Sequence, residues 1–357
     1  MRRKTMRDVS VATGLSTYTV SRALSGADGV SAESRAHVLK VAREIGYIPN
    51  RAAQELRRAN RDSVAVITAS TSNSYYLNLM EGIHHELRST GRAVIVGDIA
   101  IDGVYSAELE DQLIRRLIES RTAGVIATLT LRPENLKLLD QWDVPVVFVD
   151  SDPPEGAGHY PSVTTDNYKA SLTVGDHVAS HGYGNWLLLM YPEKWSTRFE
   201  RERGIRDAAA RHAADLTIIE CENNDLAAQE ALARHLEEAA RLPDVLIAGN
   251  NPLLLGVLKL CREKTIGIPG DMAVVSFDDF AWAPLMDPPL TVLDEDSKSI
   301  GSRAAATLTA IIEQQIESEK RSQPTKPDYK PEYRQQMPAR LVVRRSCGCS
   351  SDTREKN

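Results

Sequence analysis

The sequence of 357 residues has little of what marks secreted or membrane-spanning proteins. Its four cysteines are too few for the disulfide framework of a secreted protein. No apolar run approaches the roughly 20 residues that a transmembrane helix needs. The basic N-terminus lacks the apolar core of a signal peptide. We therefore expect a cytoplasmic protein without a membrane partner.

Sequence motifs of common active sites are also missing. The chain contains no Gly-x-Gly-x-x-Gly, Walker, Gly-x-Ser-x-Gly or His-Glu-x-x-His element. The run His84-His85-Glu86 has the residue types of a zinc protease but not their spacing. Isolated carboxylates could do acid–base work, yet no pair of them stands out. We expect a protein that is not an enzyme, with no catalytic residue and no cofactor.

Residues that could bind a metal fall into two small groups that lie far apart in the sequence. Cys347 and Cys349 form a Cys-x-Cys pair, which could bind a soft metal or take part in redox exchange. No histidine follows this pair at a ligand spacing. His177 and His181, four positions apart, could form half of a site, but no third ligand is evident. The sequence favours an incidental, exposed cysteine pair in the tail and no metal site.

Charge is divided unevenly along the chain. Residues 1–62 contain twelve Lys and Arg against six Asp and Glu, whereas the whole chain has a net charge of −6. The remainder is therefore strongly acidic. A basic module on an acidic body is typical of a protein that meets phosphate groups with one end only.

The basic segment begins with a pattern that predicts two short helices around a tight turn. Thr5 can cap the first helix, with Asp8 completing a capping box, and Gly14 stands where that helix must end. Ser16 can cap the second helix. The polar side chains of that helix that could reach DNA are Thr17, Tyr18, Thr19, Ser21 and Arg22. This spacing indicates a helix-turn-helix, in which the start of the second helix enters the major groove.

A third helix and a short linker are expected after the helix-turn-helix. Ser31 can cap a helix over residues 32–45, which Gly46 would end. Residues 50–58 are helix-prone, but a helix of that length is marginal by itself in water. From its residues alone, this segment is a charged linker.

These segments resemble the headpiece of the lac-repressor (LacI/GalR) family of bacterial transcription regulators. The motifs that carry the resemblance are Asp8-Val9, Gly14-Leu15-Ser16, Thr19-Val20-Ser21-Arg22-Ala23-Leu24, Val30-Ser31 and Gly46-Tyr47-Ile48-Pro49-Asn50. The resemblance implies a DNA-binding headpiece over residues 1–49. It also implies a hinge helix within residues 50–62, which forms when two subunits bind operator DNA together.

The resemblance also suggests which residues contact DNA. Thr17 and Tyr18 would read base edges, and Arg22 could reach a guanine or a phosphate. Leu56 falls at the position of the family's minor-groove wedge, an apolar side chain that prises a base step apart. The remaining expected contacts, outside the second helix, come from Thr5, Ser16, Asn50, Ala53 and Gln54.

From residue 63 onward, short apolar runs alternate with amphipathic stretches. The expected strands are 64–68, 93–97, 124–128, 144–150, 186–190, 216–220, 245–248 and 273–277. The expected helices are 77–90, 107–120, 133–142, 168–181, 198–211, 226–241 and 253–264. This alternation predicts parallel sheets with helices on both faces. The fold class is therefore an all-α helix-turn-helix headpiece plus an α/β body.

The body also resembles the same family, whose regulatory part shares the two-lobed periplasmic-binding-protein fold. The matching pieces are 144–150, 163–167, 201–205, 274–279 and 290–292. By this resemblance, residues 63–345 form a two-lobed domain for effector binding and dimerisation. Lobe crossings are expected near 162, 291 and 321–336, the last in a polar, Pro-rich stretch that reads as a loop. Residues 346–357 are expected to be a polar tail.

The expected ligand site lies between the two lobes, because open parallel sheets bind ligands at the carboxyl ends of their strands. The resemblance implies that Arg201 and, across the cleft, Asp278 bind the effector. A guanidinium offers a fork of donors and a carboxylate accepts, so the pair suits vicinal hydroxyls. The other candidates are Tyr75, Tyr76, Asp150, Asp166, Trp195, Thr197 and Asn250, with core packing as the competing explanation for the aromatics.

One departure from the family leaves the effector open. The family often has Asn-Asp where this chain has Asn250-Asn251, so an amide replaces a carboxylate. This change argues against a standard hexose-type grip, so a glycoside, a modified sugar, a nucleoside or a sugar acid would each fit.

The favoured interpretation is a regulator, in most relatives a repressor, that acts as a homodimer on a palindromic operator. A sugar-like effector would change its affinity for that operator, in a direction that the sequence does not give. The tail has no apolar heptads, which predicts a dimer and not a tetramer. The alternative, an extracytoplasmic sugar receptor, would need a signal peptide.

Overall fold

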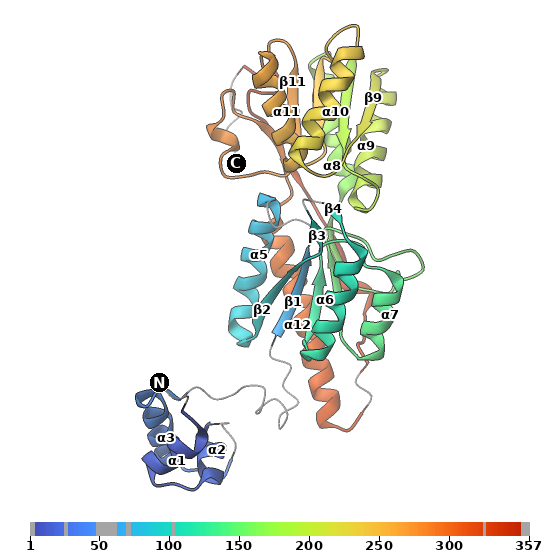
Figure 1. The fold of residues 1–357 in the computed structure, drawn as a ribbon. Coiled ribbons are helices and arrows are strands. Elements are labelled where there is room, and N and C mark those ends of the chain that lie inside the picture. Colours follow the sequence, from blue (N-terminus) through green and yellow to red (C-terminus); the bar gives the residue numbers. More distant parts are fainter. Residues whose placement is uncertain are drawn as a thin grey trace. The chain divides into compact units, whose positions relative to one another are not determined.

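A computed structural model describes residues 4–24, 28–47, 63–68, 73–101, 104–323 and 326–350 (Figure 1). The chain divides into two compact units, residues 1–61 and 62–357, which we describe separately. The expected hinge contacts Asn50, Ala53, Gln54 and Leu56 lie outside the described residues. Within the described part, no helix is both long and apolar enough to cross a membrane.

The first unit is a three-helix headpiece made of α1 (Met6–Thr13), α2 (Thr17–Leu24) and α3 (Ala32–Glu44). Thr5 and Asp8 form the predicted capping box at the start of α1, and Gly14 ends it in the left-handed region at φ 70°. The turn after α1 therefore has the conformation that glycine adopts without strain. Val9, Val20 and Val38, one from each helix, are fully buried and form the centre of its small core.

The second unit has two lobes, each built on a six-stranded sheet. The first sheet is parallel throughout, in the order β13-β7-β6-β5-β1-β2. Its strands are β1 (Ser63–Thr68), β2 (Ala93–Asp98), β5 (Gly124–Ala127), β6 (Val146–Val149), β7 (Ser162–Thr165) and β13 (Arg334–Met337). Its helices are α5 (Ser74–Leu87), α6 (Ala107–Glu119), α7 (Pro133–Gln141) and α12 (Ser297–Lys320). The shorter elements of this lobe are η1 (Arg88–Thr90), η3 (Pro331–Tyr333) and the two-stranded pair β3 (Ala100–Ile101) and β4 (Val104–Tyr105).

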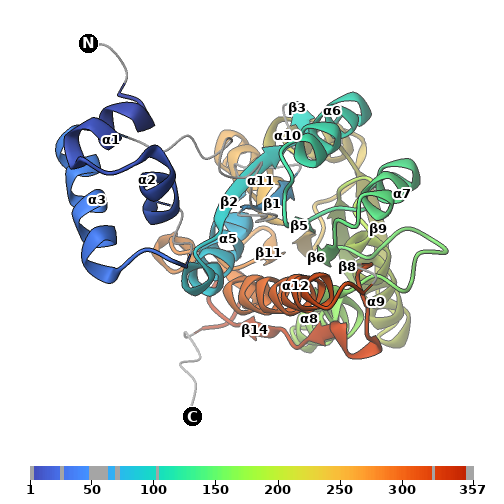
Figure 2. The same cartoon turned by 90° about the horizontal axis from the view of Figure 1, so that it is seen from below.

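Both faces of this first sheet are covered, as continuous apolar strands predict. Val64 and Val66 of β1 pack with α5 and α12, whereas Ala65 and Ile67 belong to the core on the side of α6 and α7. Figure 2 shows α5 and α12 side by side along one face. Gly82 and Gly301 permit this close approach, because a Cβ at either position would lie within about 2 Å of the backbone of the other helix.

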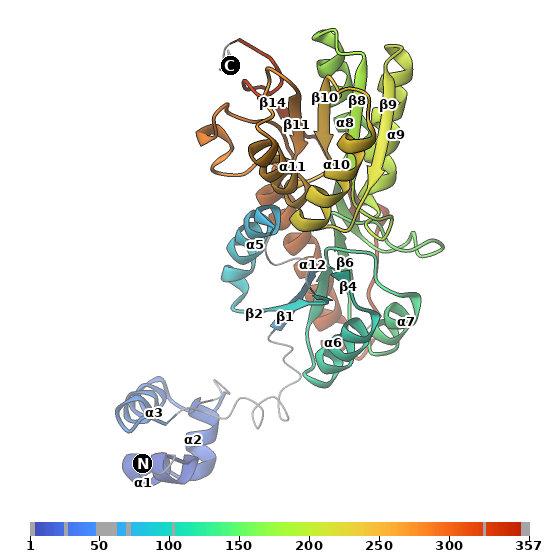
Figure 3. The same cartoon turned by 45° about the horizontal axis from the view of Figure 1, so that its top comes forward.

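The second sheet has the order β14-β12-β11-β10-β8-β9, parallel except for the antiparallel edge strand β14. Its strands are β8 (Asn185–Met190), β9 (Asp215–Glu220), β10 (Val245–Ala248), β11 (Ala273–Phe277), β12 (Thr291–Asp294) and β14 (Arg340–Val342). Its helices are α8 (Asn167–Ser180), α9 (Thr197–Arg211), α10 (Asp225–Glu238), α11 (Asn251–Lys264) and the short η2 (Ala283–Leu285). Figure 3 shows this sheet between the pair α8 and α9 and the pair α10 and α11.

Each of the eight predicted strands matches an observed one, but the structure adds elements that the sequence analysis lacks. Among them are α12, the strands β7, β12, β13 and β14, and the short pair β3 and β4. The chain passes between the lobes at residue 166, at 295–296 and at 338–339, a few residues beyond each expected crossing. Residues 334–336, expected within a loop, belong to β13 (Arg334–Met337). This edge strand is not a continuous apolar run, because it is only partly buried.

The start of the expected polar tail also belongs to the folded body. Ser346 and Cys347 are fully buried. The Ser346 hydroxyl donates to the Val274 carbonyl at 2.7 Å and accepts from the Thr291 amide at 2.8 Å. Ser346 therefore links the beginnings of β11 and β12, a long-range role that its polar sequence context does not reveal.

Candidate functional site

Arg201, on α9, is the centre of a buried polar network at the cleft side of the second lobe. Its side chain is almost fully buried and lies over the Phe277 ring, with the guanidinium carbon 4.5 Å from the ring centroid. Its Nε donates to Asn167 Oδ1 at 2.8 Å, and Nη1 donates to the Gly249 carbonyl at 2.7 Å. The guanidinium also pairs with Asp278, at 3.5 Å, and with Glu295. Arg201 thus holds together segments that are distant in sequence.

Three carboxylates lie near this single guanidinium: Asp278 and Glu295 are buried, and Asp150 is half-buried with one buried oxygen. Asp150 follows β6, Asp278 follows β11 and Glu295 follows β12, so all three stand at carboxyl ends of parallel strands. Asp150 and Asp278 have left-handed backbones, at φ 51° and 66°. Such conformations are uncommon for residues other than glycine and cluster at ligand sites.

Burial shapes the charge of these groups. Burial raises the pKa of Asp150 to about 7, against the lowering effect of Arg201, and Asp278 raises it further. The pKa of Asp278 is also raised by burial, and that of Glu295 stands well above its ordinary value for the same reason. One arginine therefore does not compensate the three acids fully.

Several buried oxygen atoms at the same place have no hydrogen-bond partner among the described residues. They are Tyr75 Oη, Asp150 Oδ1, Asn251 Oδ1 and Glu295 Oε2. Asn251 Oδ1 can only accept, and the carboxylate oxygens of Asp150 and Glu295 accept when they are ionised. A buried polar atom without a partner costs about 1–3 kcal/mol. The site is therefore suited to a molecule that brings several O–H or N–H donors.

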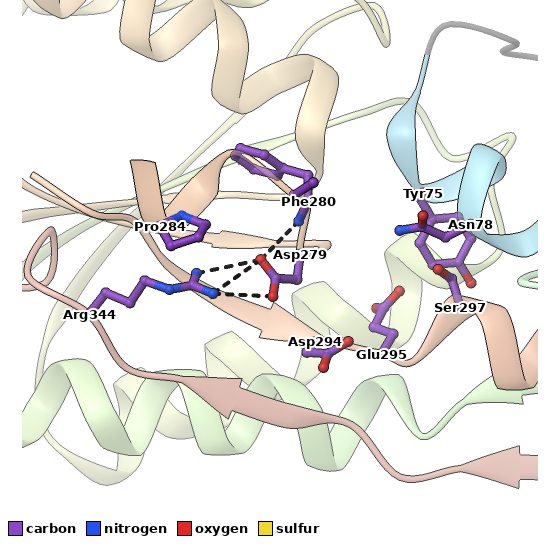
Figure 4. Close-up of a pocket in the computed structure, with 10 residues that line it drawn as sticks. Tyr75, Asn78, Asp279, Phe280, Pro284, Asp294, Glu295, Ser297 and Arg344 are labelled. Carbon is purple, nitrogen blue, oxygen red and sulfur yellow. Dashed lines mark hydrogen bonds and ion pairs between the residues drawn. The ribbon is translucent and has the colours of Figure 1, made fainter. Parts of the chain in front are cut away.

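A cavity of about 280 Å³ opens beside this network and is lined by both lobes. In Figure 4, Tyr75, Asn78 and Ser297 of the first lobe face Asp279, Phe280 and Pro284 of the second, with Glu295 between them. Arg344 pairs with Asp279 at 3.3 Å in the wall of the second lobe. Tyr75 and Glu295 belong both to the cavity lining and to the set with unpartnered oxygens, which connects the cavity to the buried network.

Polar contacts join the two lobes around the cleft. Asn251, at the start of α11, donates through Nδ2 to the Ser74 hydroxyl at 2.8 Å and so reaches the start of α5. The Ser196 hydroxyl accepts from the Asp152 amide at 2.8 Å on another side. Hydrogen bonds of this kind between small side chains can be replaced by contacts to a ligand or to water.

Two of the expected ligand residues have capping roles in the structure. Asp166 accepts from the Lys169 amide at 3.2 Å and pairs with the Lys169 ammonium at 2.7 Å, which lowers the pKa of Asp166 despite its partial burial. Asn250 caps α11 through Oδ1 and donates to Asn223 at 2.7 Å. In both cases the next residue makes the longer-range contact: Asn167 bonds to Arg201 of the network, and Asn251 bonds to Ser74 of the other lobe.

The expected aromatic residues are largely buried. Tyr75 and Tyr76 pack edge to face, with ring centroids 5.3 Å apart, and Tyr75 lines the cavity. Trp195 packs against Tyr191, and the Thr197 hydroxyl shares a 2.8 Å hydrogen bond with the Tyr191 hydroxyl. Trp195 and Thr197 therefore hold Tyr191 in place and do not line the cavity.

The sequence analysis missed Glu295, Asn167 and Asn251 as candidate site residues. Glu295 had a usable signal, because it follows the apolar run of β12 as Asp150 follows β6. Recognising residues 291–294 as a strand would have pointed to it.

The headpiece presents a polar face on α2. Tyr18 is 69% exposed, and its hydroxyl accepts from Arg22 Nη1 at 3.0 Å. Ser16 and Thr17 are also exposed, and the Ser16 hydroxyl accepts from the Thr19 amide at 3.1 Å, which caps α2. Thr19, Ser21 and Arg22 are half-buried. The Thr5 hydroxyl is engaged by Asp8, at 2.8 Å.

Comparison with known families gives two matches, one in each compact unit. Residues 5–50 match the family described as bacterial regulatory proteins, lacI family. Residues 176–347 match a periplasmic binding protein-like domain.

Similar proteins include two bacterial repressors. The chain is 28% identical over 312 residues to the ribose operon repressor of Bacillus subtilis (strain 168), covering 87% of this chain and 92% of that protein. It is 25% identical over 307 residues to the transcriptional repressor CytR of Escherichia coli (strain K12), covering 85% and 88%.

Solved structures with this fold include a lac repressor dimer bound to operator and the anti-inducer ONPF. It has a TM-score of 0.76 at 22% identity and covers 97% of this chain and 99% of its own. A LacI family regulator from Enterococcus faecium with bound ribose has a TM-score of 0.67 at 19% identity, covering 80% and 98%.

Proposed function

This chain belongs to the lac-repressor (LacI/GalR) family of bacterial transcription regulators, and we propose that it represses its target genes as a homodimer on a palindromic operator. Residues 1–49 would bind the major groove, and residues 50–62 would form the hinge. A sugar or sugar-derived effector would bind between the lobes and change operator affinity. On its operator, the protein would be associated with the nucleoid.

The face of α2 supports the DNA-binding part of this proposal. Thr17 and Tyr18 are exposed at the start of the second helix, where this motif reads base edges. Arg22 lies one turn further, and its bond to the Tyr18 hydroxyl orients both side chains together. Around them, the basic headpiece supplies the phosphate attraction that holds such a domain on DNA.

The edge of the first lobe supports the homodimer. β2 is the edge strand of its sheet, and Val96 is 48% exposed on it. Leu77, on α5, is 62% exposed. Exposed apolar side chains beside an open sheet edge are covered in many proteins by a second copy.

The observation that carries the effector proposal is the set of unpartnered acceptors around Arg201. Asp150, Asn251 and Glu295 each leave a buried oxygen free, whereas Arg201 brings donors to the same place. Vicinal hydroxyls both donate and accept, so a polyol matches this mixture. The ribose and cellobiose bound in two solved structures of similar fold are polyols of this kind.

The proposed switch follows from the contacts to both lobes. An effector held by Asp150 of the first lobe and Asp278 of the second would favour one arrangement of the lobes over the other. The hinge segment precedes β1 directly, so the preferred arrangement would change how two hinges meet. Such coupling between two sites typically amounts to about 1–3 kcal/mol, or roughly 5- to 150-fold in operator affinity.

The test begins with selection of an operator from fragmented genomic DNA, at fixed salt. Fluorescence anisotropy on the recovered site would then be measured with sugars, glycosides, sugar acids and nucleosides. We expect a palindromic site and one class of hydroxylated compound that shifts its affinity. Binding that is blind to sequence would refute the DNA-reading role of α2.

A variant pair tests the effector site separately. Glu295→Gln should keep operator affinity but lose most of the response to the compound. Glu81→Gln is the matched control, because Glu81 is an exposed carboxylate of the first lobe paired with Lys298. An equal response in both variants would contradict the assigned cleft.

A further inference from the structure

Two pairs of potential metal ligands that are far apart in sequence meet at one corner of the second lobe. His177 lies on the last turn of α8, and His181 is the residue that ends this helix. Cys347 and Cys349 follow β14. One nitrogen or sulfur atom from each of the four residues lies within 4.8 Å of all the others. The structure therefore brings together the histidine pair and the cysteine pair, which are far apart in the sequence.

The four ligand atoms lie close enough together to bind a single ion. His181 Nε2 lies 3.5 Å from Cys349 Sγ, and the rings of His177 and His181 are nearly perpendicular, with centroids 5.0 Å apart. A tetrahedral Zn²⁺ with two sulfur and two nitrogen ligands has ligand–ligand distances of about 3.4–3.8 Å. Small side-chain rotations would bring the four atoms to that spacing.

His177 supplies a second, independent observation. Its Nε2 atom is buried and has no hydrogen-bond partner among the described residues. An imidazole nitrogen in this situation lacks a proton donor or acceptor that water would otherwise provide. A metal ion bound at Nε2 would satisfy it.

The backbone around the cysteines is already fixed in a turn that presents both sulfur atoms. Gly348 lies at φ 96°, and a Cβ there would stand 2.5 Å from the Tyr183 hydroxyl. That hydroxyl donates to the Cys347 carbonyl at 3.0 Å. The Tyr183 ring also stacks on His181, with centroids 5.4 Å apart. Tyr183 thus positions one ligand from each pair.

We propose that His177, His181, Cys347 and Cys349 bind one Zn²⁺ ion at a structural site. Two thiolates and two neutral imidazoles balance the charge of the ion. Cys347 is buried, and the other three ligands are half-buried. Four protein ligands complete the tetrahedron and leave no open position, so the site stabilises structure and does no chemistry. Mixed sulfur and nitrogen ligands select zinc over magnesium or calcium.

The consequence would be a fixed C-terminal segment. The ion would join residues 347–349 to the end of α8, the helix whose first residue, Asn167, contacts Arg201. Ser346, next to the site, links the beginnings of β11 and β12. Metal binding would therefore strengthen the lobe that holds the arginine of the cleft.

The test uses the full chain, carrying an affinity tag without histidine and purified under reducing conditions. Elemental analysis by mass spectrometry should find about one zinc per chain. Replacement by Co²⁺ should give the intense visible bands of a tetrahedral site with thiolate ligands. Chelation should lower the melting temperature, and added Zn²⁺ should restore it.

Variants distinguish this site from adventitious binding. Cys349→Ser and His181→Gln should each lose the stoichiometric metal and the cobalt spectrum. Cys221→Ser and His212→Gln are matched controls outside the cluster and should keep both. Zinc retained equally by all four variants would overturn the proposal. So would a reduced wild-type chain that binds no Co²⁺, or a Cys347–Cys349 disulfide that persists in place of the metal.

Discussion

The α2 face of the headpiece and the cleft of the body both consist of polar side chains, but they are built in opposite ways. Tyr18 and Thr17 protrude from one short helix whose folding depends on other residues. Arg201, Asp278 and Glu295 come from separate segments and are buried in the structure that they help to form. Folding and binding are therefore separable in the headpiece and linked in the cleft.

This difference has a physical basis in desolvation. Exposed polar groups keep their water until DNA replaces it, so their contribution to folding is small. Buried charges have already lost their water and depend on one another. The following predictions use this contrast, beginning with the largest effect.

The largest expected effect is on the stability of the body when the Arg201 guanidinium is removed. Arg201→Met leaves Asp278 and Glu295 buried without their partner, which we expect to cost about 3–5 kcal/mol of unfolding free energy. Tryptophan fluorescence during urea unfolding is a suitable measurement, because all four tryptophans lie in the body. Arg203→Met is the control on the same helix, since Arg203 is exposed and pairs with Glu200. If Arg201→Met lowered the unfolding free energy by less than about 1 kcal/mol, folding and binding would not be linked in the cleft.

Truncation on α2 should have the complementary result. Tyr18→Ala should weaken operator binding by about 1–3 kcal/mol, roughly 5- to 150-fold, and leave the unfolding of the body unchanged. Tyr18→Phe retains the ring but removes the hydroxyl that orients Arg22, so it should lie between wild type and Tyr18→Ala. Equal losses on operator and on unrelated DNA would show that Tyr18 contributes to affinity without reading sequence.

The pH dependence of effector binding should give the smallest but most specific effect. The pKa of Asp150 is about 7 in the free protein, raised by burial. A hydroxyl that donates to Asp150 favours the ionised form, so binding would release a proton. Effector affinity should therefore rise as pH increases toward 7, by at most about tenfold per pH unit, and level off above it.

Asp150→Asn should remove this dependence in calorimetric titrations between pH 6 and pH 8. The same group has the opposite effect on folding. Because the folded pKa lies above the ordinary value, Asp150 costs stability progressively as pH rises from about 4 to about 7. An effector affinity that is flat over this range in the wild type would exclude a direct bond to Asp150.

Local signals were enough to predict the headpiece. The capping box of Thr5 and Asp8 and the left-handed Gly14 involve residues close in sequence, so their residue types determine them. The eight predicted strands were also legible as apolar runs, because the inner strands of each sheet are covered on both faces. The long helix α12 was not predicted. Its buried face carries Ile300, Leu308 and Ile311, but Gly301, Ala304 and Thr307 interrupt this apolar series where α12 packs closely.

The cleft could be predicted only as a region. The strand-end rule located Asp150 and Asp278, and the family resemblance located Arg201. At 166–167 and 250–251 the sequence analysis selected the residue that caps a helix instead of its neighbour. Asp and Asn are favoured both as caps and as ligands, so residue type cannot separate these roles. The cluster of His181 and Cys349 could not be predicted from the sequence. These residues are 168 positions apart, and they meet only because the chain folds back beside β14.

Glu295 occupies a special position, because it lies in one of the three segments that pass between the lobes. Its carboxylate contacts Arg201 of one lobe, and α12 of the other lobe begins two residues later. The 24 residues of α12 span about 36 Å. A rotation of about 5° at this pivot would displace the far end of the helix by about 3 Å relative to the second lobe. A molecule that competes with Arg201 for Glu295 would therefore act at the pivot between the lobes. A small change of contact there would produce a large displacement at the far end of α12.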